Sequence, residues 1–328
     1  MVKRIEGFLG LFFIGILFFI NPFPQNSLSQ EPYPTKPITM VIRSGAGGMA
    51  DTMTRLLCKV TEKELGQPII CENRTGGGGV VGMTYVLKSK PDGYILGAST
   101  TGPYINSPHM EKVPYDPLTD VTDIMVYFKY THALCVRSDA PWNTFEDILT
   151  YARQNPGKFT YGAAGVGVTQ HIVMERIAMK EGVKWSFVPC KSGAEPTIAC
   201  LEGHIHAVAQ GPADVVPHIQ AGKLKLLLAL NDNRWEIAPK VPTVLEKYGF
   251  YGLSLQGIYG PKGIPESIRE KLQNAFRKAM NDPSYVEGAK TLNVVTLYMG
   301  GKDYEKLWKS QYDEMGKIIR AIGLGRKD

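Results

Sequence analysis

Residues 38–66 read ITMVIRSGAGGMADTMTRLLCKVTEKELG, and this stretch decides the fold class. Its first five residues form a mainly apolar run that predicts a buried strand, and a glycine-rich turn follows soon after. Apolar residues then recur at helical spacing up to Gly66, a residue type that often ends helices. The stretch therefore reads as a strand, a glycine turn and a helix, which is the repeating unit of an α/β sheet.

The same unit recurs along the chain. A strand at residues 68–71 leads into the run Gly76–Gly79 and a helix, and a strand at residues 159–162 leads into Gly165–Gly167 and another helix. We therefore expect an α/β fold in which mostly parallel sheets are flanked by helices. Further strands are expected at residues 94–98, 126–136, 185–189, 207–209, 224–230 and 253–260.

Three further helices are indicated by local patterns. Thr144 and Asp147 have the spacing of a capping box, which predicts a helix start. Two amphipathic stretches near the end of the chain, residues 268–279 and 304–322, predict helices whose apolar stripes pack on a sheet.

The length of 328 residues suits two modest lobes rather than one domain. We expect a leader at residues 1–29, a first lobe made of residues 30–130 and 251–328, and a second lobe at residues 131–250. The chain would thus cross between the lobes twice, and the second lobe would be an insertion in the first.

The first residues have the features of a secretory signal peptide. Lys3 and Arg4 precede the apolar segment 7–20, which is shorter than the roughly 20 residues of a membrane span. Small residues then stand at positions 27 and 29, so we expect cleavage after Ser29 and a periplasmic mature protein. The alternative is an uncleaved N-terminal anchor.

Composition excludes several classes of function. The formal net charge of +6 comes from Lys and Arg residues scattered among acids, which does not favour nucleic-acid binding. The five cysteines are widely spaced, and the pair His204 and His206 has no evident third ligand, so no metal site is expected. Nucleotide-binding and serine-hydrolase motifs are absent, so we expect no cofactor and no catalytic residues.

Three glycine loops are the candidate binding elements. Gly45–Gly48, Gly76–Gly79 and Gly165–Gly167 each follow a predicted strand and precede a predicted helix. Ligands of open α/β sheets bind beyond the carboxyl ends of the strands, where helix N-termini point unpaired N–H groups outward. Glycine lets the backbone approach a ligand closely, and the helix N-terminus favours a negative group such as a carboxylate.

Several motifs together carry a family resemblance. They are, in chain order, Tyr33–Ile38, Gly47–Asp51, Glu72–Gly79, Lys90–Tyr94, Gly165–Gly167, His171, Val188–Pro189, Ala221–Leu224, Val241–Thr243 and Gly260–Pro261. In this order they resemble the receptors of tripartite tricarboxylate transporters, the Bug-type periplasmic binding proteins. The resemblance covers nearly the whole chain after the leader.

This resemblance implies a two-lobe architecture of periplasmic-binding-protein type II, which closes over a small organic carboxylate. One carboxylate group would be held by backbone amides of the first two loops, while Asp51 would brace the first loop. The ligand-binding residues that it implies are Ser44, Gly47, Gly48, Asn73, Gly76, Gly78, Gly79, Gly165, Gly167, Thr169, His171 and Gln210.

The chain departs from the pattern of this family at four positions. The family usually has proline and an aromatic residue where this chain has Arg43 and Ser44, and Arg43 could add a charged contact to a carboxylate. Val168 stands in place of a serine, whose hydroxyl Thr169 could replace. Gln210 stands where the family often has an acid, which removes a preference for a ligand amino group.

We therefore expect a monomeric extracytoplasmic solute receptor that hands its ligand to the membrane subunits of a transporter. Two other classes of function stay open. One is a ligand-loaded sensor that docks on a membrane kinase, and the other is an enzyme that acts on a carboxylate in the cleft between the lobes. An enzyme would need an activated nucleophile or an acid/base pair, whereas the predicted loops contain mainly glycine and hydroxyl residues.

Overall fold

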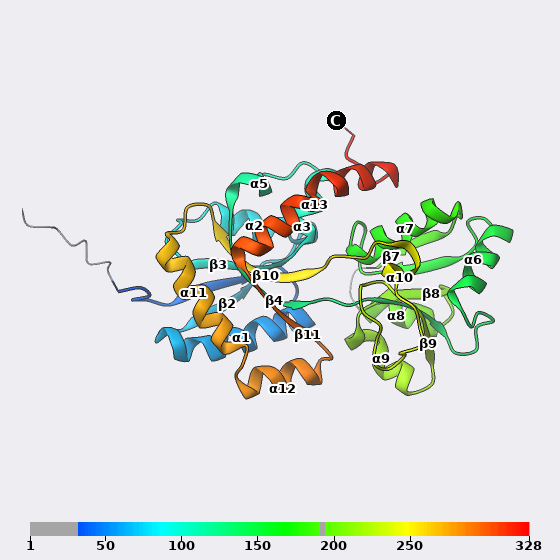
Figure 1. Ribbon diagram of the computed structural model, residues 1–328, viewed down its shortest axis with the longest axis horizontal. Helices are drawn as coiled ribbons and strands as arrows, with labels where there is room; N and C mark the ends of the chain where they lie inside the picture. Colours follow the sequence, from blue (N-terminus) through cyan, green and yellow to red (C-terminus); the bar gives the residue numbers. More distant parts are fainter. Residues whose placement is uncertain (1–31, 191–193, 328) are drawn as a thin grey trace, which may run out of the picture. The chain divides into compact units, whose positions relative to one another are not determined.

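The computed structural model describes residues 32–190 and 194–327, so the predicted signal peptide and its cleavage site lie outside the described residues. The described residues form two β-sheets with flanking helices (Figure 1). We call the sheet that contains the N-terminal strands, together with its helices, the first lobe, and the other sheet with its helices the second lobe. Among the described helices, none combines the length and the apolar composition that crossing a membrane requires.

The first lobe contains a six-stranded sheet in the order β11-β4-β10-β3-β1-β2. Its strands are β1 (Ile38–Ile42), β2 (Ile69–Asn73), β3 (Ile95–Thr100), β4 (Val121–Lys129), β10 (Leu255–Pro261) and β11 (Val295–Gly300). Strand β1 pairs in parallel with β2 and β3, whereas β10 is antiparallel to both β3 and β4, and β11 is antiparallel to β4.

The helices of the first lobe follow its strands and connections. They are α1 (Met49–Leu65), the 3₁₀ turn η1 (Gly77–Gly79), α2 (Val80–Leu87), α3 (Gly102–Ile105), α4 (Ser107–Met110), α5 (Pro117–Asp120), α11 (Glu266–Ala279), α12 (Pro283–Thr291) and α13 (Gly301–Ala321). Buried aromatic side chains of α3, β10 and α13 meet in the core, where the rings of Tyr104 and Tyr304 lie 5.9 Å apart.

The second lobe contains a five-stranded sheet in the order β7-β6-β8-β5-β9. The strands are β5 (Ala133–Arg137), β6 (Thr160–Ala163), β7 (Ser186–Pro189), β8 (Ala207–Gln210) and β9 (Leu224–Ala229). The helices are α6 (Phe145–Gln154), α7 (Thr169–Glu181), α8 (Ala194–Leu201), α9 (Pro212–Gln220) and α10 (Val244–Tyr248). Strand β6 is parallel to β7 and β8, whereas β5 is antiparallel to β8 and β9.

Two segments carry the chain between the sheets, one from β4 to β5 and one from α10 to β10 (Figure 1). The side chain of Asn231 joins them. Its Nδ2 donates to the carbonyl oxygens of Tyr130 at 3.2 Å and Gly252 at 2.9 Å, and its Oδ1 accepts from the backbone N–H of His132 at 2.5 Å. One buried amide group thus fixes both crossing segments against each other.

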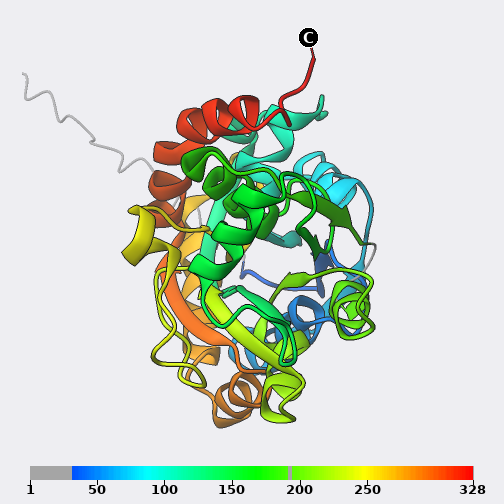
Figure 2. The same ribbon diagram turned by 90° about the vertical axis from the view of Figure 1, so that its right-hand side faces the viewer.

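Helix α13 also contacts the second lobe. Ile318 and Ile319 of α13 form an apolar cluster with Ile172 of α7, and the two helices lie side by side in both views (Figures 1 and 2). The guanidinium of Arg176 lies 3.4 Å from the carboxylate of Glu314 beside this cluster. These contacts tie the end of the chain to the helix that follows the third glycine loop.

The expected two-lobe α/β fold is confirmed, and the predicted capping box at Thr144 and Asp147 is present at the start of α6. The expectation of mostly parallel sheets was wrong, because both sheets are mixed, and among the strands of the described residues the parallel pairings are those of β1 and β6. The reason is that an apolar run predicts a buried strand without predicting its direction. Strand β11 and helix α12 were not predicted; β11 is an edge strand whose residues are exposed or partly buried.

Candidate functional site

The first glycine loop joins β1 to α1 and is held in shape by Asp51. The carboxylate of this buried residue accepts hydrogen bonds from the backbone N–H of Gly47 at 2.9 Å and from Nε of Arg55 at 2.9 Å. It also accepts a bond from Nδ2 of Asn73 at 2.8 Å. Burial alone would raise the pKa of Asp51, but these three bonds hold it below its ordinary value. Such contacts are those of a loop brace.

The amides that follow Gly47 are open. Among the described residues, the backbone N–H groups of Gly48 and Met49 have no hydrogen-bond acceptor, as expected for the first positions of a helix. Gly48 is exposed and has an extended backbone with φ of −73°. The loop therefore presents unpaired donors at the positive end of the 17-residue helix α1.

The second glycine loop joins β2 to α2 and has a backbone that only glycine adopts easily. Gly76, Gly77, Gly78 and Gly79 have φ values of 123°, 54°, 60° and 108° in succession. The N–H groups of Gly76, Gly77 and Gly78 have no acceptor among the described residues, whereas that of Gly79 donates to the carbonyl oxygen of Gly76. Successive free amides of this kind form a concave anion-binding nest.

Asn73 links the first two loops rather than pointing a free group into solvent. Its Nδ2 donates to the carbonyl oxygen of Ser44 at 2.9 Å as well as to Asp51, and its Oδ1 accepts from Nη2 of Arg55 at 2.6 Å. The amide therefore holds the two loops in register with each other.

Arg43 and Ser44 follow directly after β1, next to both loops. Nη1 of Arg43 donates to the carbonyl oxygen of Gly78 at 2.6 Å, and Nη2 donates to Oγ1 of Thr100 at 2.5 Å. The hydroxyl of Ser44 is buried and has no hydrogen-bond partner among the described residues. The end of β1 thus brings a cation and an unpaired hydroxyl to the same edge of the sheet.

The third glycine loop, in the second lobe, uses its amides internally. The N–H of Gly165 donates to the carbonyl oxygen of Ala163 at 2.8 Å, and that of Gly167 donates to Nδ1 of His171 at 3.0 Å. His171 is buried with its ring stacked 3.8 Å from that of Phe187, and burial lowers its pKa to about 4. The imidazole is therefore neutral near pH 7 and acts as an acceptor for its own loop.

The remaining expected residues lie at the start of α7 and the end of β8. Thr169 is the first residue of α7, and its methyl group packs close to Gly252. A Cβ added to Gly252 would lie 2.6 Å from the Cγ2 atom of Thr169. Gln210 ends β8, is buried, and is paired with Ala133.

The sequence did not predict one contact between the lobes. Nδ2 of Asn106, between α3 and α4, donates to the carbonyl oxygen of Gly167 at 3.1 Å. The Oδ1 atom of this buried side chain has no partner among the described residues. No sequence signal points to Asn106, because a lone asparagine in a loop is ordinary turn chemistry.

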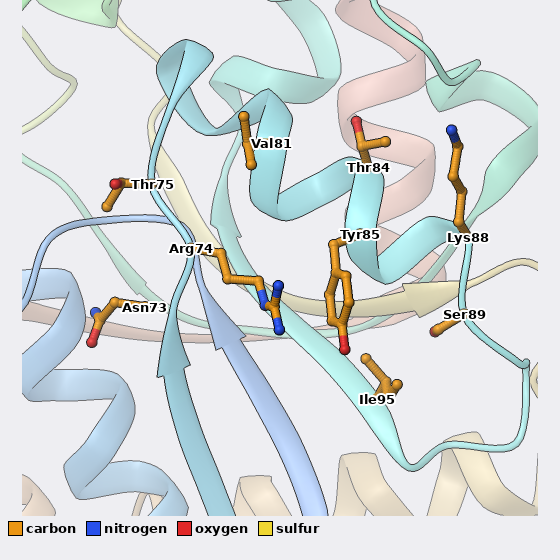
Figure 3. Close-up of a pocket in the computed structure, with 9 residues that line it drawn as sticks. All are labelled: Asn73, Arg74, Thr75, Val81, Thr84, Tyr85, Lys88, Ser89 and Ile95. Carbon is orange, nitrogen blue, oxygen red and sulfur yellow. The ribbon is translucent and has the colours of Figure 1, made fainter.

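A pocket of about 770 Å³ adjoins the second loop on the side of α2 (Figure 3). Arg74, Tyr85 and Thr75 are among the residues that line it, and the guanidinium of Arg74 lies 3.7 Å from the ring centroid of Tyr85. None of the glycines with free amides lines this pocket. It is therefore a surface recess beside the candidate site rather than the site itself.

The described residues offer anion-binding groups but no evident catalytic set. No cluster of three or more His, Cys, Asp or Glu side chains in the described ranges is placed to hold a metal ion. His206, singled out in the sequence, accepts a hydrogen bond from the backbone N–H of Thr160 at 3.1 Å. The five cysteines are free thiols. The chemistry that the loops can perform is the binding of a negative group by backbone amides and a guanidinium.

The fold and the loops define a two-lobe α/β binding protein. Residues 53–324 match the tripartite tricarboxylate transporter family receptor, and the chain belongs to this family. It is 37% identical over 297 residues to the UPF0065 protein in the gbd 5' region of Cupriavidus necator, with 90% of each chain covered.

Two solved structures illustrate the similarity. A TctC solute-binding protein from Polaromonas is 29% identical with a TM-score of 0.76, covering 88% of this chain and 99% of its own. An R. palustris protein solved with adipate is 25% identical with a TM-score of 0.79, covering 89% of this chain and 99% of its own.

Proposed function

We propose that this protein is a periplasmic receptor that binds a small organic carboxylate and delivers it unchanged to the membrane subunits of a tripartite tricarboxylate transporter. Membership of the receptor family supports the transport role. The R. palustris relative with adipate supports a carboxylate as the class of ligand.

The observation that carries the proposal is the set of unpaired amides in the first two loops. Gly48 and Met49 present two N–H groups, and Gly76 to Gly78 present three, with no acceptor among the described residues. Asn73 and Asp51 hold the two loops against each other, so the two groups of donors belong to one edge of the sheet. A carboxylate there would replace the water that these donors otherwise bind, at the positive end of α1.

Other groups would complete the site. We assign the hydroxyl of Ser44 and the side chain of Gln210 to ligand contacts, with Gly165, Gly167 and Thr169 as the part contributed by the second lobe. Three residues that were expected to touch the ligand are instead assigned to bracing the loops, because their polar groups already form hydrogen bonds within the protein. They are Gly47, Asn73 and His171. The lobes would comprise residues 30–130 with 251–328 and residues 131–250, hinged at the segments that Asn231 joins.

The proposal includes the absence of turnover. The hydroxyl of Ser44 has no base within hydrogen-bond distance among the described residues, so nothing there would activate it as a nucleophile. His171 uses Nδ1 to accept from Gly167, and the carboxylate of Asp51 is saturated with donors. These contacts support a receptor over an enzyme.

The test is to identify what the native protein carries. Protein exported by its own host would be purified without denaturant, and the compounds released on unfolding would be identified by mass spectrometry. We expect a small molecule with at least one carboxyl group, which on adding back raises the melting temperature in a concentration-dependent way. Steady conversion of the compound, or a released compound without a carboxyl group, would contradict the proposal.

Delivery and location need separate measurements. Intact mass of the periplasmic protein is expected to show a chain that begins after Ser29, and gel filtration is expected to show a monomer. Uptake of the identified ligand should require both this protein and the transporter subunits. Unchanged uptake without the subunits, with loss of a kinase response, would instead support the sensor alternative.

A further inference from the structure

Arg43 lies where the first lobe would hold its ligand. It follows β1 at the carboxyl end of the parallel strands, and its side chain packs under the second loop, because an added Cβ on Gly79 would lie 2.6 Å from its Cδ. The guanidinium reaches Gly78 on one side and Thr100 on the other. Two of its five N–H donors are thus used, and the residue stays partly open to solvent.

The guanidinium of Arg43 has no anionic partner among the described residues. No carboxylate of the described residues forms an ion pair with Arg43, and its electrostatic neighbours are the hydroxyls of four tyrosines, namely Tyr130, Tyr259, Tyr115 and Tyr304. Burial raises the pKa of each of these tyrosines, so all four are neutral near pH 7. Burial also lowers the pKa of Arg43, although an arginine keeps its charge at neutral pH.

Arg43 is thus a partly buried cation without a counterion among the described residues, which is costly in a folded protein. The usual remedies are an internal carboxylate or an anion from outside, and the described residues supply no carboxylate within ion-pair distance. The amides of the loops already match one carboxylate group of a ligand. A monocarboxylate bound by the loop amides would therefore leave the guanidinium of Arg43 without an anionic partner.

We propose that Arg43 is a specificity-determining residue that pairs with a second anionic group, so that the natural ligand is a di- or tricarboxylate. This inference rests on the proposed function and narrows its class of ligand. In the complex, the free amides of the two loops hold one carboxylate group and the guanidinium holds the other. The bonds to Gly78 and Thr100 fix the plane of the guanidinium, which limits the entropy lost on pairing.

A purely structural role would act through the second loop, since Arg43 donates to the carbonyl oxygen of Gly78. Loss of that bond would disturb the amide nest and weaken every carboxylate alike. The two roles are thus separated by comparing acids of equal carbon number with one and two carboxyl groups.

The experiment measures calorimetric affinities for three matched pairs: succinate and butyrate, glutarate and pentanoate, adipate and hexanoate. Wild type is expected to bind at least one diacid about tenfold or more tightly than its monoacid, because hydrogen bonds between two charged groups are stronger than those between neutral groups. R43M should remove this preference while changing monoacid affinity by about twofold or less. R43K should retain part of it, since a lysine keeps the charge but loses the planar fork.

T100V is the matched control, because it removes one acceptor of the guanidinium and leaves its charge. It should retain the diacid preference, and melting curves would confirm that all variants fold. Three results would overturn the inference: equal weakening of diacids and monoacids by R43M, a wild type that prefers monoacids, or a wild type that binds neither the six acids nor propane-1,2,3-tricarboxylate. The proposed function fails by a different result, namely a released native ligand without any carboxyl group.

Discussion

The glycine loops of the two lobes use their backbone amides differently. In the first lobe, the amides of Gly48 and of Gly76 to Gly78 have no acceptor among the described residues, and side chains such as Asp51 brace the loops from behind. In the second lobe, Gly165 and Gly167 give their N–H groups to their own loop. In the proposed complex, the free amides of the first lobe would bind the anion, whereas the second lobe would cover it with a loop whose amides are already paired.

The strongest test of this difference is Gly48→Val. The backbone of Gly48 suits any residue, and an added Cβ would meet only the carbonyl oxygen of Gly45 at 3.7 Å, so the fold should tolerate the change. The side chain would cover the free amides, and we expect about a hundredfold loss of affinity for the carboxylate, or about 2.7 kcal/mol.

Calorimetry and melting curves would check this prediction, with Gly45→Ala as the control. Gly45 lies in the same loop and has open space around its Cα, so a methyl group there should leave affinity nearly unchanged. Unchanged affinity in Gly48→Val would show that the first loop does not grip the ligand.

The second lobe is expected to respond to pH through His171. Its pKa of about 4 in the folded protein lies below the ordinary 6.5, so the folded state favours the neutral ring. Stability from this residue is present above pH 6.5 and is lost as pH falls toward 4, by up to about 3 kcal/mol. His171→Asn should therefore show a smaller fall in melting temperature between pH 6.5 and 4 than wild type.

His132 has a similarly lowered pKa of about 4 and supplies a background slope that both proteins share. The measurement is thus the difference between the two pH profiles. Parallel profiles would mean that His171 is not held neutral by its loop.

Asp51→Asn tests the brace of the first lobe. The carboxylate has a lowered pKa, so its stabilisation is present above the unfolded value near pH 4 and is lost as pH falls through the folded value. The variant should lose about 2 kcal/mol of stability at pH 7, because three hydrogen bonds to a charged acceptor are weakened. Chemical denaturation at pH 7 and pH 3 would check it, since the deficit should shrink at the lower pH.

The smallest expected effect is that of Asn106→Ala, which removes a bond between the lobes. Its donation to Gly167 is one neutral hydrogen bond, which contributes about 1 kcal/mol and would shift a closed population by about fivefold. Scattering with saturating ligand should show a less compact average than wild type. Identical scattering curves would show that this bond does not control closure.

Local units of this fold could be predicted from the sequence, whereas contacts between distant residues could not. Strand β1 and helix α1 were predicted because their apolar periodicity and Gly66 act over a few residues. Strand direction was not predictable, since β3 and β10 are equally apolar whichever way they run. The hydrogen bonds between Asn106 and Gly167 and between Asn231 and His132 could not be predicted either, because they join residues 61 and 99 positions apart.

The candidate site shows the same division. The glycine loops could be recognised as candidate binding elements from the sequence, because a run of glycines indicates a backbone that other residues adopt poorly. The positive φ values of Gly76 to Gly79 agree with this. The sequence could not show which backbone amides stay free, because this depends on where side chains such as Asp51 and His171 place their acceptor atoms.

The strand order of the first sheet also governs how the chain can fold. Strand β10 lies between β3 and β4, and it pairs Gln256 with both Thr100 and Phe128. All of β5 to β9 is synthesised before that strand exists. During synthesis the second sheet can thus be completed while β3 and β4 still lack their shared neighbour. Until β10 is synthesised, the edges of β3 and β4 that it will cover stay unpaired, so the first sheet is open to pairing with other chains for longer than the second.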